Sequence, residues 1–148
     1  MTEIAPISHT LPARLNSLPV LGDQLRQFLA PLQLAESWIF MLDLALCEAA
    51  TNIIRHGYEQ NIDKSYTVTF ALEQEAVVVS LRDGGEPIPP EQLEAASKEP
   101  APGEETIEQL SESGRGLRLM FDCVDGVHYR QERQENILTL MKHLPTEP

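Results

Sequence analysis

One stretch of this chain, Leu46–Tyr58, carries polar side chains at a regular helical spacing. Glu48, Asn52 and His56 are four residues apart, so an α-helix would stack them along one face. The apolar residues of the same helix suit the opposite face and a protein core: Trp38, Ile39, Leu42, Leu46, Ala49 and Ile53. Polar groups next to a core need partners, which a bound ligand or a metal ion can supply. The alternative is the solvated face of an ordinary amphipathic helix.

A second motif, Asp83-Gly84-Gly85-Glu86-Pro87, directly follows an expected buried strand. A carboxylate at the end of a strand can accept a hydrogen bond from the amino group of a ligand, and glycine allows the backbone to approach that ligand closely. Asp-Gly pairs also mark ordinary turns, which is the competing interpretation.

A third motif, Ser113-Gly114-Arg115-Gly116-Leu117, is expected to open a helix. A glycine-rich turn at a helix N-terminus exposes backbone N–H groups that bind phosphate, and the helix dipole favours the same negative charge. Arg115 can add charge-assisted hydrogen bonds to phosphate oxygens. The pattern is neither the Walker A sequence nor the Rossmann fingerprint.

The elements that hold these motifs follow from hydrophobic periodicity and turn residues. Pro31 should end the first helix, and Gly57 suits the C-terminal cap of the second. The expected elements are a strand within residues 6–14, helices at about 17–30 and Ala35–His56, strands at Tyr66–Leu72 and Ala76–Leu81, a short helix at Pro90–Ser97, a helix beginning near Gly114–Gly116, and strands at Val124–Gln131 and Asn136–His143. This order predicts a single domain over residues 1–148, an α/β (α+β) two-layer sandwich. Its sheet should be mixed but mostly antiparallel, with the helices on one face.

The composition disfavours several classes of partner. The net charge of −12 argues against direct binding of nucleic acid and against anionic membranes. We expect no segment with the ~18–20 apolar residues of a membrane span and no secretory signal. Cys47 and Cys123 lack CxxC spacing, so they are interpreted as reduced core residues of a cytoplasmic protein.

Charge is concentrated between residues 84 and 113. This segment holds eight glutamates, one basic residue (Lys98) and five of the eleven prolines. It is either a solvated loop that keeps the protein soluble, or a mobile lid or docking surface for a basic partner.

The three motifs together are more specific than any one of them. Asp83 follows Asn52 by 31 residues, and Gly114 follows Asp83 by the same number. In this order the sequence resembles the GHKL nucleotide-binding superfamily with its histidine-kinase-like ATPase domain, and within it the anti-sigma-factor serine/threonine kinases of bacteria. The resemblance covers about residues 8–144. It is carried most specifically by the block EAATNIIRHGYEQN and by the ending DGVHYRQERQENILTLMKHL.

The resemblance implies a Bergerat-type ATP-binding fold that uses ATP and Mg²⁺. It implies that Asn52 coordinates the Mg²⁺ that bridges the phosphates, and that Glu48 acts as general base or orients the attacking hydroxyl. Asp83 would recognise the adenine amino group, and Gly85 would give the base room. The chemistry agrees, because Mg²⁺ prefers oxygen ligands and phosphoryl transfer needs positioning and charge neutralisation with a carboxylate near the nucleophile.

The resemblance assigns the remaining nucleotide contacts to three segments. The residues of Gly114–Leu117 would hold the phosphates, and the segment at about 86–113 would be the ATP lid. Thr139 is the candidate beside the adenine, because many relatives place a threonine on the last strand. Two positions depart from the family pattern: Glu112 stands where some members carry a basic residue, and Arg118 where a small or apolar residue is common.

The function that the resemblance implies is an ATP-dependent protein serine/threonine kinase. It would phosphorylate a small anti-sigma antagonist and also sequester a sigma factor or similar regulator. The alternative is a nucleotide-dependent partner-binding switch with little or no kinase activity, and Glu48 favours the kinase because a pure switch needs no base. A detached sensor-kinase domain is less favoured, since no phosphoacceptor helix pair is recognisable. A homodimer is expected from the resemblance alone.

Overall fold

The computed structural model describes residues 4–59, 61, 63–98 and 112–145. Residues 99–111, which make up much of the segment expected to be the ATP lid, lie outside the described residues.

The sheet has five strands in the order β1-β2-β3-β5-β4, and each neighbouring pair is antiparallel. The expectation of a largely antiparallel sheet is therefore confirmed, and the described part contains no parallel pair. The strands are β1 (Ile7–Pro12), β2 (Ser65–Glu73), β3 (Ala76–Asp83), β4 (Gly126–Glu132) and β5 (Glu135–His143).

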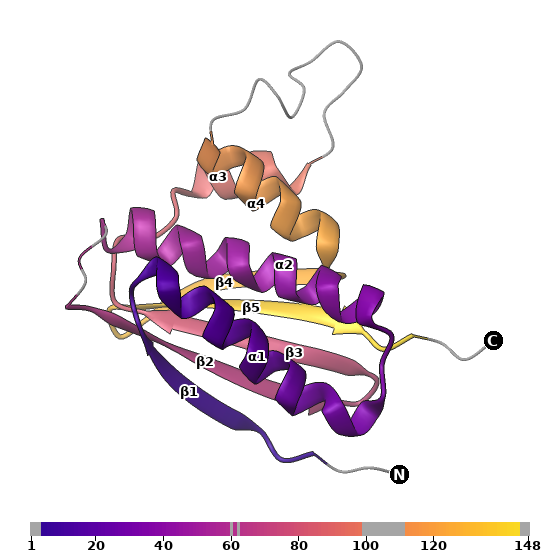
Figure 1. Cartoon of the computed structure of the whole chain (residues 1–148). Helices are drawn as coiled ribbons and strands as arrows, with labels where there is room; N and C mark the ends of the chain where they lie inside the picture. Colours follow the sequence, from indigo (N-terminus) through magenta and orange to yellow (C-terminus); the bar gives the residue numbers. More distant parts are fainter. Residues whose placement is uncertain (1–3, 60, 62, 99–111, 146–148) are drawn as a thin grey trace.

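The helices cover one face of this sheet, as the two-layer prediction requires (Figure 1). They are α1 (Leu18–Leu29), α2 (Glu36–Asn52), α3 (Pro90–Ser97) and α4 (Glu112–Cys123), with short turns at Leu15–Ser17, Ala30–Leu32 and Ile53–Gly57. Helices α1 and α2 lie side by side above the sheet, and α4 packs against α2 and α3. Pro31 lies in the turn that ends α1, as expected.

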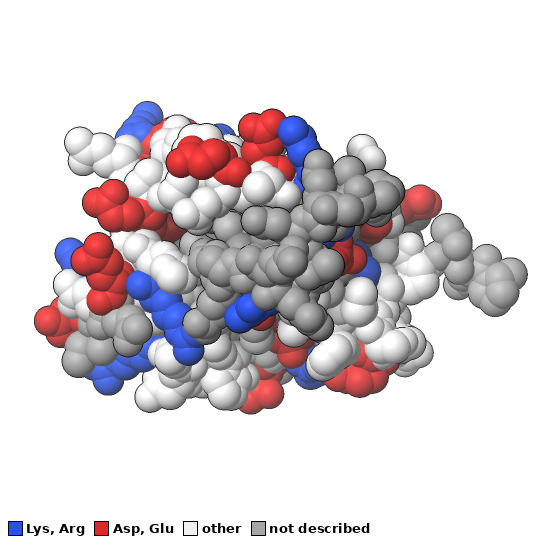
Figure 2. Space-filling view, turned by 90° about the horizontal axis from the view of Figure 1, so that it is seen from above, with Lys and Arg blue, Asp and Glu red and all other residues white. Residues whose placement is uncertain are grey.

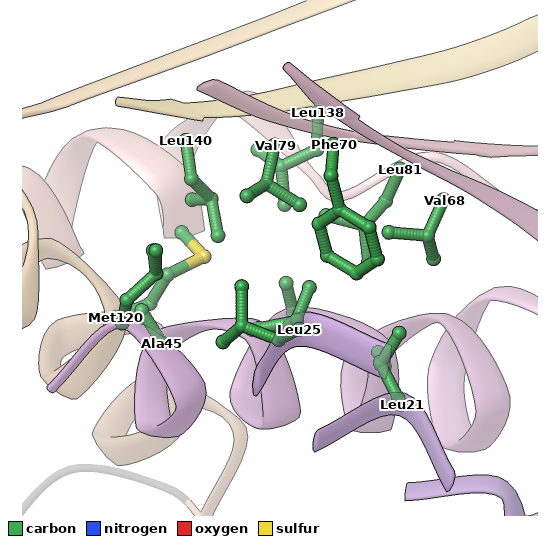
Figure 3. Packing of buried hydrophobic residues seen from close by; sticks show 14 of the residues in the cluster. Leu21, Leu25, Ala45, Val68, Phe70, Val79, Leu81, Met120, Leu138 and Leu140 are labelled. Atoms are coloured by element: carbon green, nitrogen blue, oxygen red, sulfur yellow. The ribbon is translucent and has the colours of Figure 1, made fainter. Parts of the chain in front are cut away.

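The core lies between the two layers (Figure 3). Leu21 and Leu25 of α1 and Met120 of α4 point toward the sheet, where they meet alternate residues of β2, β3 and β5. On β3 this alternation makes Val79 and Leu81 fully buried, and Asp83 is the next residue on the same face. At the end of β3, the Asp83 carboxylate therefore points toward the helices, on the same face of the strand as Val79 and Leu81.

Helix α2 is unusually apolar because it is the central helix of this layer. With the turn that follows it, Glu36–Gly57, it is the one described segment long and apolar enough to cross a bilayer by length and composition, with a mean hydropathy of 1.4. It is not a continuous run of apolar residues, because Asp43 and Glu48 interrupt it. The packing explains the composition, since Leu42, Leu46 and Ala50 are fully buried in the core.

Both cysteines are free, as expected for a reduced core. Cys123 is buried, and Cys47 is half-buried with its thiol donating to Asp43 Oδ1 at 3.3 Å. Burial, helped by the negative charge of Asp43, raises the pKa of the Cys47 thiol to about 12. The thiol therefore stays protonated and unreactive at neutral pH.

Candidate functional site

The helix that carries the first motif changes its winding at Asn52. The α-helix ends there, and Ile53–Gly57 continues as one π-helical turn closed by the bond from Tyr58 N to Ile53 O at 2.9 Å. Gly57 was expected to cap an α-helix that runs to His56, and that prediction is wrong: Gly57 is the last residue of the π turn. Single π turns are frequent at functional sites, because the extra residue redirects the side chains that follow.

A cavity of about 400 Å³ opens between this helix and α4. It brings together residues of the first and third motifs, which are some 60 residues apart in the chain. Its lining consists of Glu48, Thr51, Asn52, Arg55, His56, Arg115, Gly116, Leu117 and Leu119. The two arginines and the neutral amide make the cavity suitable for an anionic group such as a chain of phosphates.

Asn52 also lies in the wall of a second, narrower pocket, together with Ala49, Asp83, Ile88 and Tyr129. This pocket has room for about one water molecule, at about 10 Å³, so a planar base must displace neighbouring side chains to enter it. The two spaces share Asn52 and are otherwise lined by different residues. One elongated ligand can therefore occupy both, with its middle at Asn52.

The Asp83 side chain is held in place by two hydrogen bonds. Asn136 Nδ2 donates to Asp83 Oδ1 at 3.1 Å, and the backbone N–H of Gly85 donates to the same oxygen at 2.9 Å. Among the described residues, the bonds to this carboxylate thus end on Oδ1. The second oxygen, Oδ2, is the acceptor that a ligand amino group can use.

Burial raises the pKa of Asp83 above its usual value of 3.8, and the hydrogen bonds from Asn136 and Gly85 offset part of that rise. A buried carboxylate held in this way costs stability and is retained at sites of function more often than elsewhere.

Gly85 approaches the π turn closely. A Cβ atom at Gly85 would overlap the carbonyl group of Gly57, so only glycine fits at this position. The carbonyl oxygen of Gly57 accepts a hydrogen bond from Glu86 N at 2.7 Å. Gly85 was predicted to give the adenine room. In the structure, the contact that requires a glycine here is the one with the Gly57 backbone beside the pocket.

Two tyrosines fix the loop after β3. Tyr58 OH donates to Ser65 O at 2.9 Å and accepts from Gly84 N at 2.7 Å, and Tyr129 OH accepts from Ile88 N at 2.9 Å. These bonds hold the loop over the narrow pocket and set the position of Asp83 relative to Asn52.

The third motif lies within a helix rather than before one. Helix α4 begins at Glu112, so the free N–H groups of its first turn belong to residues 112–114, and Gly116 is two positions beyond them. The expected glycine-rich turn is therefore wrong in detail. Arg115 is exposed at the cavity, whereas Leu117 is buried in the core.

Gly116 has a different role in the structure. A Cβ atom at this position would overlap Oε2 of Glu48, so the absence of a side chain is what lets the Glu48 carboxylate lie against α4. Gly116 therefore allows the first and third motifs to pack against each other.

The structure does not bring Thr139 to this site. Thr139 pairs with Ser80, and their hydroxyl oxygens are 3.3 Å apart on the sheet face opposite the helices. Asp83 pairs instead with Asn136, which is buried and bonded to it. Because side chains alternate along a strand, Thr139 and Asn136 point to opposite faces, and the expectation for Thr139 is wrong.

Two site residues were missed in the sequence. Asn136 could have been found by pairing the last strand with β3, since its position opposite Asp83 fixes its face. Arg55 lines the cavity three residues after Asn52, but a straight α-helix through His56 does not single it out. His56 itself is exposed and lines the cavity only at its margin.

Replacing Asp83 by asparagine should raise stability and weaken binding of a ligand whose amino group donates to Oδ2. The folded-state pKa of Asp83 is raised, so its ionised form destabilises the fold as pH rises through that pKa, and the penalty is absent below the unfolded value of about 3.8. The Asp83→Asn protein should therefore melt higher than wild type at pH 7, with the difference shrinking toward pH 4. The affinity for such a ligand should fall about 10- to 100-fold, because a charge-assisted hydrogen bond is lost. Melting curves and calorimetry measure both; a lower melting temperature at pH 7 together with unchanged affinity would contradict this role.

Replacing Gly116 by alanine should separate stability from activity. Alanine favours the helix by up to about 1 kcal/mol, so thermal stability should be kept or increased. The new methyl group must displace the Glu48 carboxylate, and we expect a reaction that uses this carboxylate to slow at least about tenfold. In a Glu48→Gln background the same change should cause little further loss, because the two residues act as one unit. Full additivity of the two losses would show that Gly116 acts independently of Glu48.

Comparisons with known proteins agree with this geometry. Residues 11–142 match the model of the histidine kinase-like ATPase domain family. A serine-protein kinase RsbW of Bacillus licheniformis is 34% identical over 90 residues, which are 59% of this chain and 54% of that protein. An anti-sigma F factor of Bacillus velezensis is 31% identical over 118 residues, which are 79% of this chain and 77% of that protein.

A solved structure shows the same fold. The crystal structure of the RsbU and RsbW domains of a Mycobacterium tuberculosis protein superimposes with a TM-score of 0.65 at 22% identity. The match covers 95% of this chain and 32% of the other. The chain thus spans about half the length of the RsbW relatives it matches, and a larger share of the anti-sigma F factors.

Proposed function

Because the chain belongs to the histidine kinase-like ATPase domain family, we propose that it is an ATP-dependent protein serine/threonine kinase of the anti-sigma-factor type. The observation that carries the proposal is the position of Asn52 in the walls of both pockets. One ATP molecule can then place its base at Asp83 and its phosphates between Arg55 and Arg115.

Each end of the nucleotide has a chemically suitable partner. The adenine amino group donates to the Oδ2 atom of Asp83, whose orientation Asn136 maintains. The phosphates meet the guanidinium groups of Arg55 and Arg115 and the free N–H groups of the first turn of α4, which include that of Gly114.

The residues present fit a Mg²⁺ ion that is held chiefly by the substrate. No group of three or more histidine, cysteine, aspartate or glutamate side chains that could enclose a metal occurs in the described part of the chain. Mg²⁺ usually takes only one or two protein ligands and completes its shell with phosphates and waters. The Oδ1 atom of Asn52 would supply the protein oxygen, and the ion would neutralise charge on the phosphates.

Glu48 is placed to act on the attacking hydroxyl. It lies one helical turn before Asn52 and is fixed against Gly116 in the wall of the cavity. A serine oxygen attacks the γ-phosphorus, the bond from that phosphorus to the bridging oxygen of ADP breaks, and the serine proton passes to the Glu48 carboxylate. The products are ADP and phosphoserine.

The partners follow from the relatives. The RsbW proteins are named serine-protein kinases and the others anti-sigma F factors. We therefore assign to this chain a small anti-sigma antagonist as phosphate acceptor and a sigma factor or similar regulator as the sequestered protein. We also assign it a single domain over residues 1–148, a cytoplasmic location and a homodimer, for which the sheet face opposite the helices is available.

The test is transfer of labelled phosphate. The purified protein is incubated with ATP labelled at the γ-phosphate, Mg²⁺ and a candidate small anti-sigma antagonist from the same organism. Phosphoserine on the antagonist, absent without Mg²⁺, is the expected result. Tight binding of ATP and of the antagonist without transfer would instead identify a nucleotide-dependent switch.

A further inference from the structure

The outer face of α2 carries an apolar strip that leads to the cavity. This strip, here called the Phe40 ridge, consists of Phe40 and Met41, which are exposed, and Leu44, which is partly buried against the core. Phe40 and Leu44 are separated by one helical turn, and Glu48 follows after one further turn. The ridge therefore runs in line with the carboxylate that the proposed function uses as base.

The exposure of this ridge is not explained by the fold. Phe40 is 55% exposed and Met41 is 37% exposed, although both belong to the central helix. The other large apolar residues that are exposed, Ile7, Leu15 and Val20, lie on separate elements. Single exposed apolar residues are normal, but adjacent ones beside a functional cavity mark a contact surface.

The ridge lies on the same helix as the carboxylate that acts on the hydroxyl. Glu48 lines the cavity together with Leu119 of α4, so part of the cavity wall is apolar. Phe40 precedes Glu48 by eight residues, which corresponds to about 12 Å along the helix axis. A protein that presents its serine to Glu48 must pass over this surface.

Two exposed acids lie on the helices that form this face. Glu36 is exposed one turn before Phe40, and Asp122 is half-exposed on α4. They pair with Arg26 and Arg118 respectively, whose side chains are less exposed than the acids. Figure 2 shows acidic and basic side chains together on this side of the molecule.

Resting on the proposed function, we propose that the Phe40 ridge is the docking surface for the protein substrate. The substrate presents an apolar side chain about 12 Å from its acceptor serine, on a surface with basic residues that face Glu36 and Asp122. The ridge binds the acceptor protein, and the cavity holds the residues that carry out phosphate transfer.

The experiment measures binding and transfer separately in a Phe40→Gln, Met41→Gln variant. The probes are the antagonist protein that accepts phosphate in the transfer test above and a form of it whose acceptor serine is replaced by alanine. We expect the Kd for the alanine form and the KM for the antagonist to rise about 10- to 100-fold. The Kd for ATP and the kcat at saturating antagonist should stay within about twofold, since the ridge does not touch the nucleotide.

Matched controls distinguish docking from general effects. Val20→Gln removes an equally exposed apolar residue from α1 and should change neither constant, and Phe40→Leu should restore most of the affinity. An unchanged Kd for the alanine form in the double variant overturns the docking proposal. The proposal is also overturned if the double variant only dissociates a dimer of this chain, because the ridge would then be the contact surface for a second copy. Antagonist binding that depends on Phe40, without any transfer by wild type, would refute the kinase function and leave the docking surface standing.

Discussion

Glu48→Gln should lower phosphate transfer to the antagonist by about 10²–10⁴-fold, the usual contribution of a general base. Glutamine has the size of glutamate and keeps one carbonyl oxygen, so the contact with Gly116 and the shape of the cavity should be retained. The variant can no longer take the serine proton at neutral pH. ATP affinity and antagonist affinity should therefore remain close to those of wild type, and the loss should appear in kcat.

Single-turnover transfer with labelled ATP measures this loss directly, and calorimetry measures both affinities. Glu75→Gln is the matched control, because Glu75 is an exposed carboxylate in the turn between β2 and β3 and lies outside the cavity. Full transfer by the Glu48 variant would leave the protein a kinase but would remove Glu48 as its base.

Asn52→Ala should abolish the gain in ATP affinity that Mg²⁺ provides. Asn52 is the residue shared by the two pockets, and its side-chain oxygen is the protein ligand assigned to the ion. Alanine leaves a residual, metal-independent affinity that comes from Asp83 and the arginines. Transfer should fall below detection, because the phosphates lose both their neutralising charge and their position.

Titrations of ATP with and without Mg²⁺ test this expectation. Thr51→Ala serves as the control, since Thr51 lines the same cavity on the neighbouring helical position. If the Asn52 variant binds ATP more tightly with Mg²⁺ than without it, the ion must be held elsewhere.

Much of the fold could be predicted from periodicity and turn residues. The alternation within β2 and β3 and the helical spacing of α1 and α2 each agree with the layer in which these elements lie. Because the strands come in consecutive pairs along the chain, only a few topologies are possible. These pairs predict an antiparallel sheet with the helices on one face. Glu48 and Asn52 could be singled out by their helical spacing on the face opposite the apolar residues, and Asp83 by its position at the end of a buried strand.

The predictions from the sequence were wrong where the position of a residue depends on the pairing of strands or on the local winding of a helix. Thr139 and Asn136 differ by three residues on one strand, and only the register with β3 decides which of them meets Asp83. The π turn adds one residue after Asn52, which periodicity at 3.6 residues per turn cannot show. Gly116 was assigned to phosphate binding by its type, whereas its tertiary contact with Glu48 gives it a steric role.

The most direct test of the central claim is a crystal structure of the protein with Mg²⁺ and a non-hydrolysable ATP analogue. We predict one nucleotide that spans both pockets. Its adenine amino group should donate to Asp83 Oδ2, its metal ion should be bound by Asn52, and its terminal phosphate should lie within reach of a hydroxyl activated by Glu48. A nucleotide whose base lies away from Asp83, or whose terminal phosphate points away from Glu48, would contradict the account.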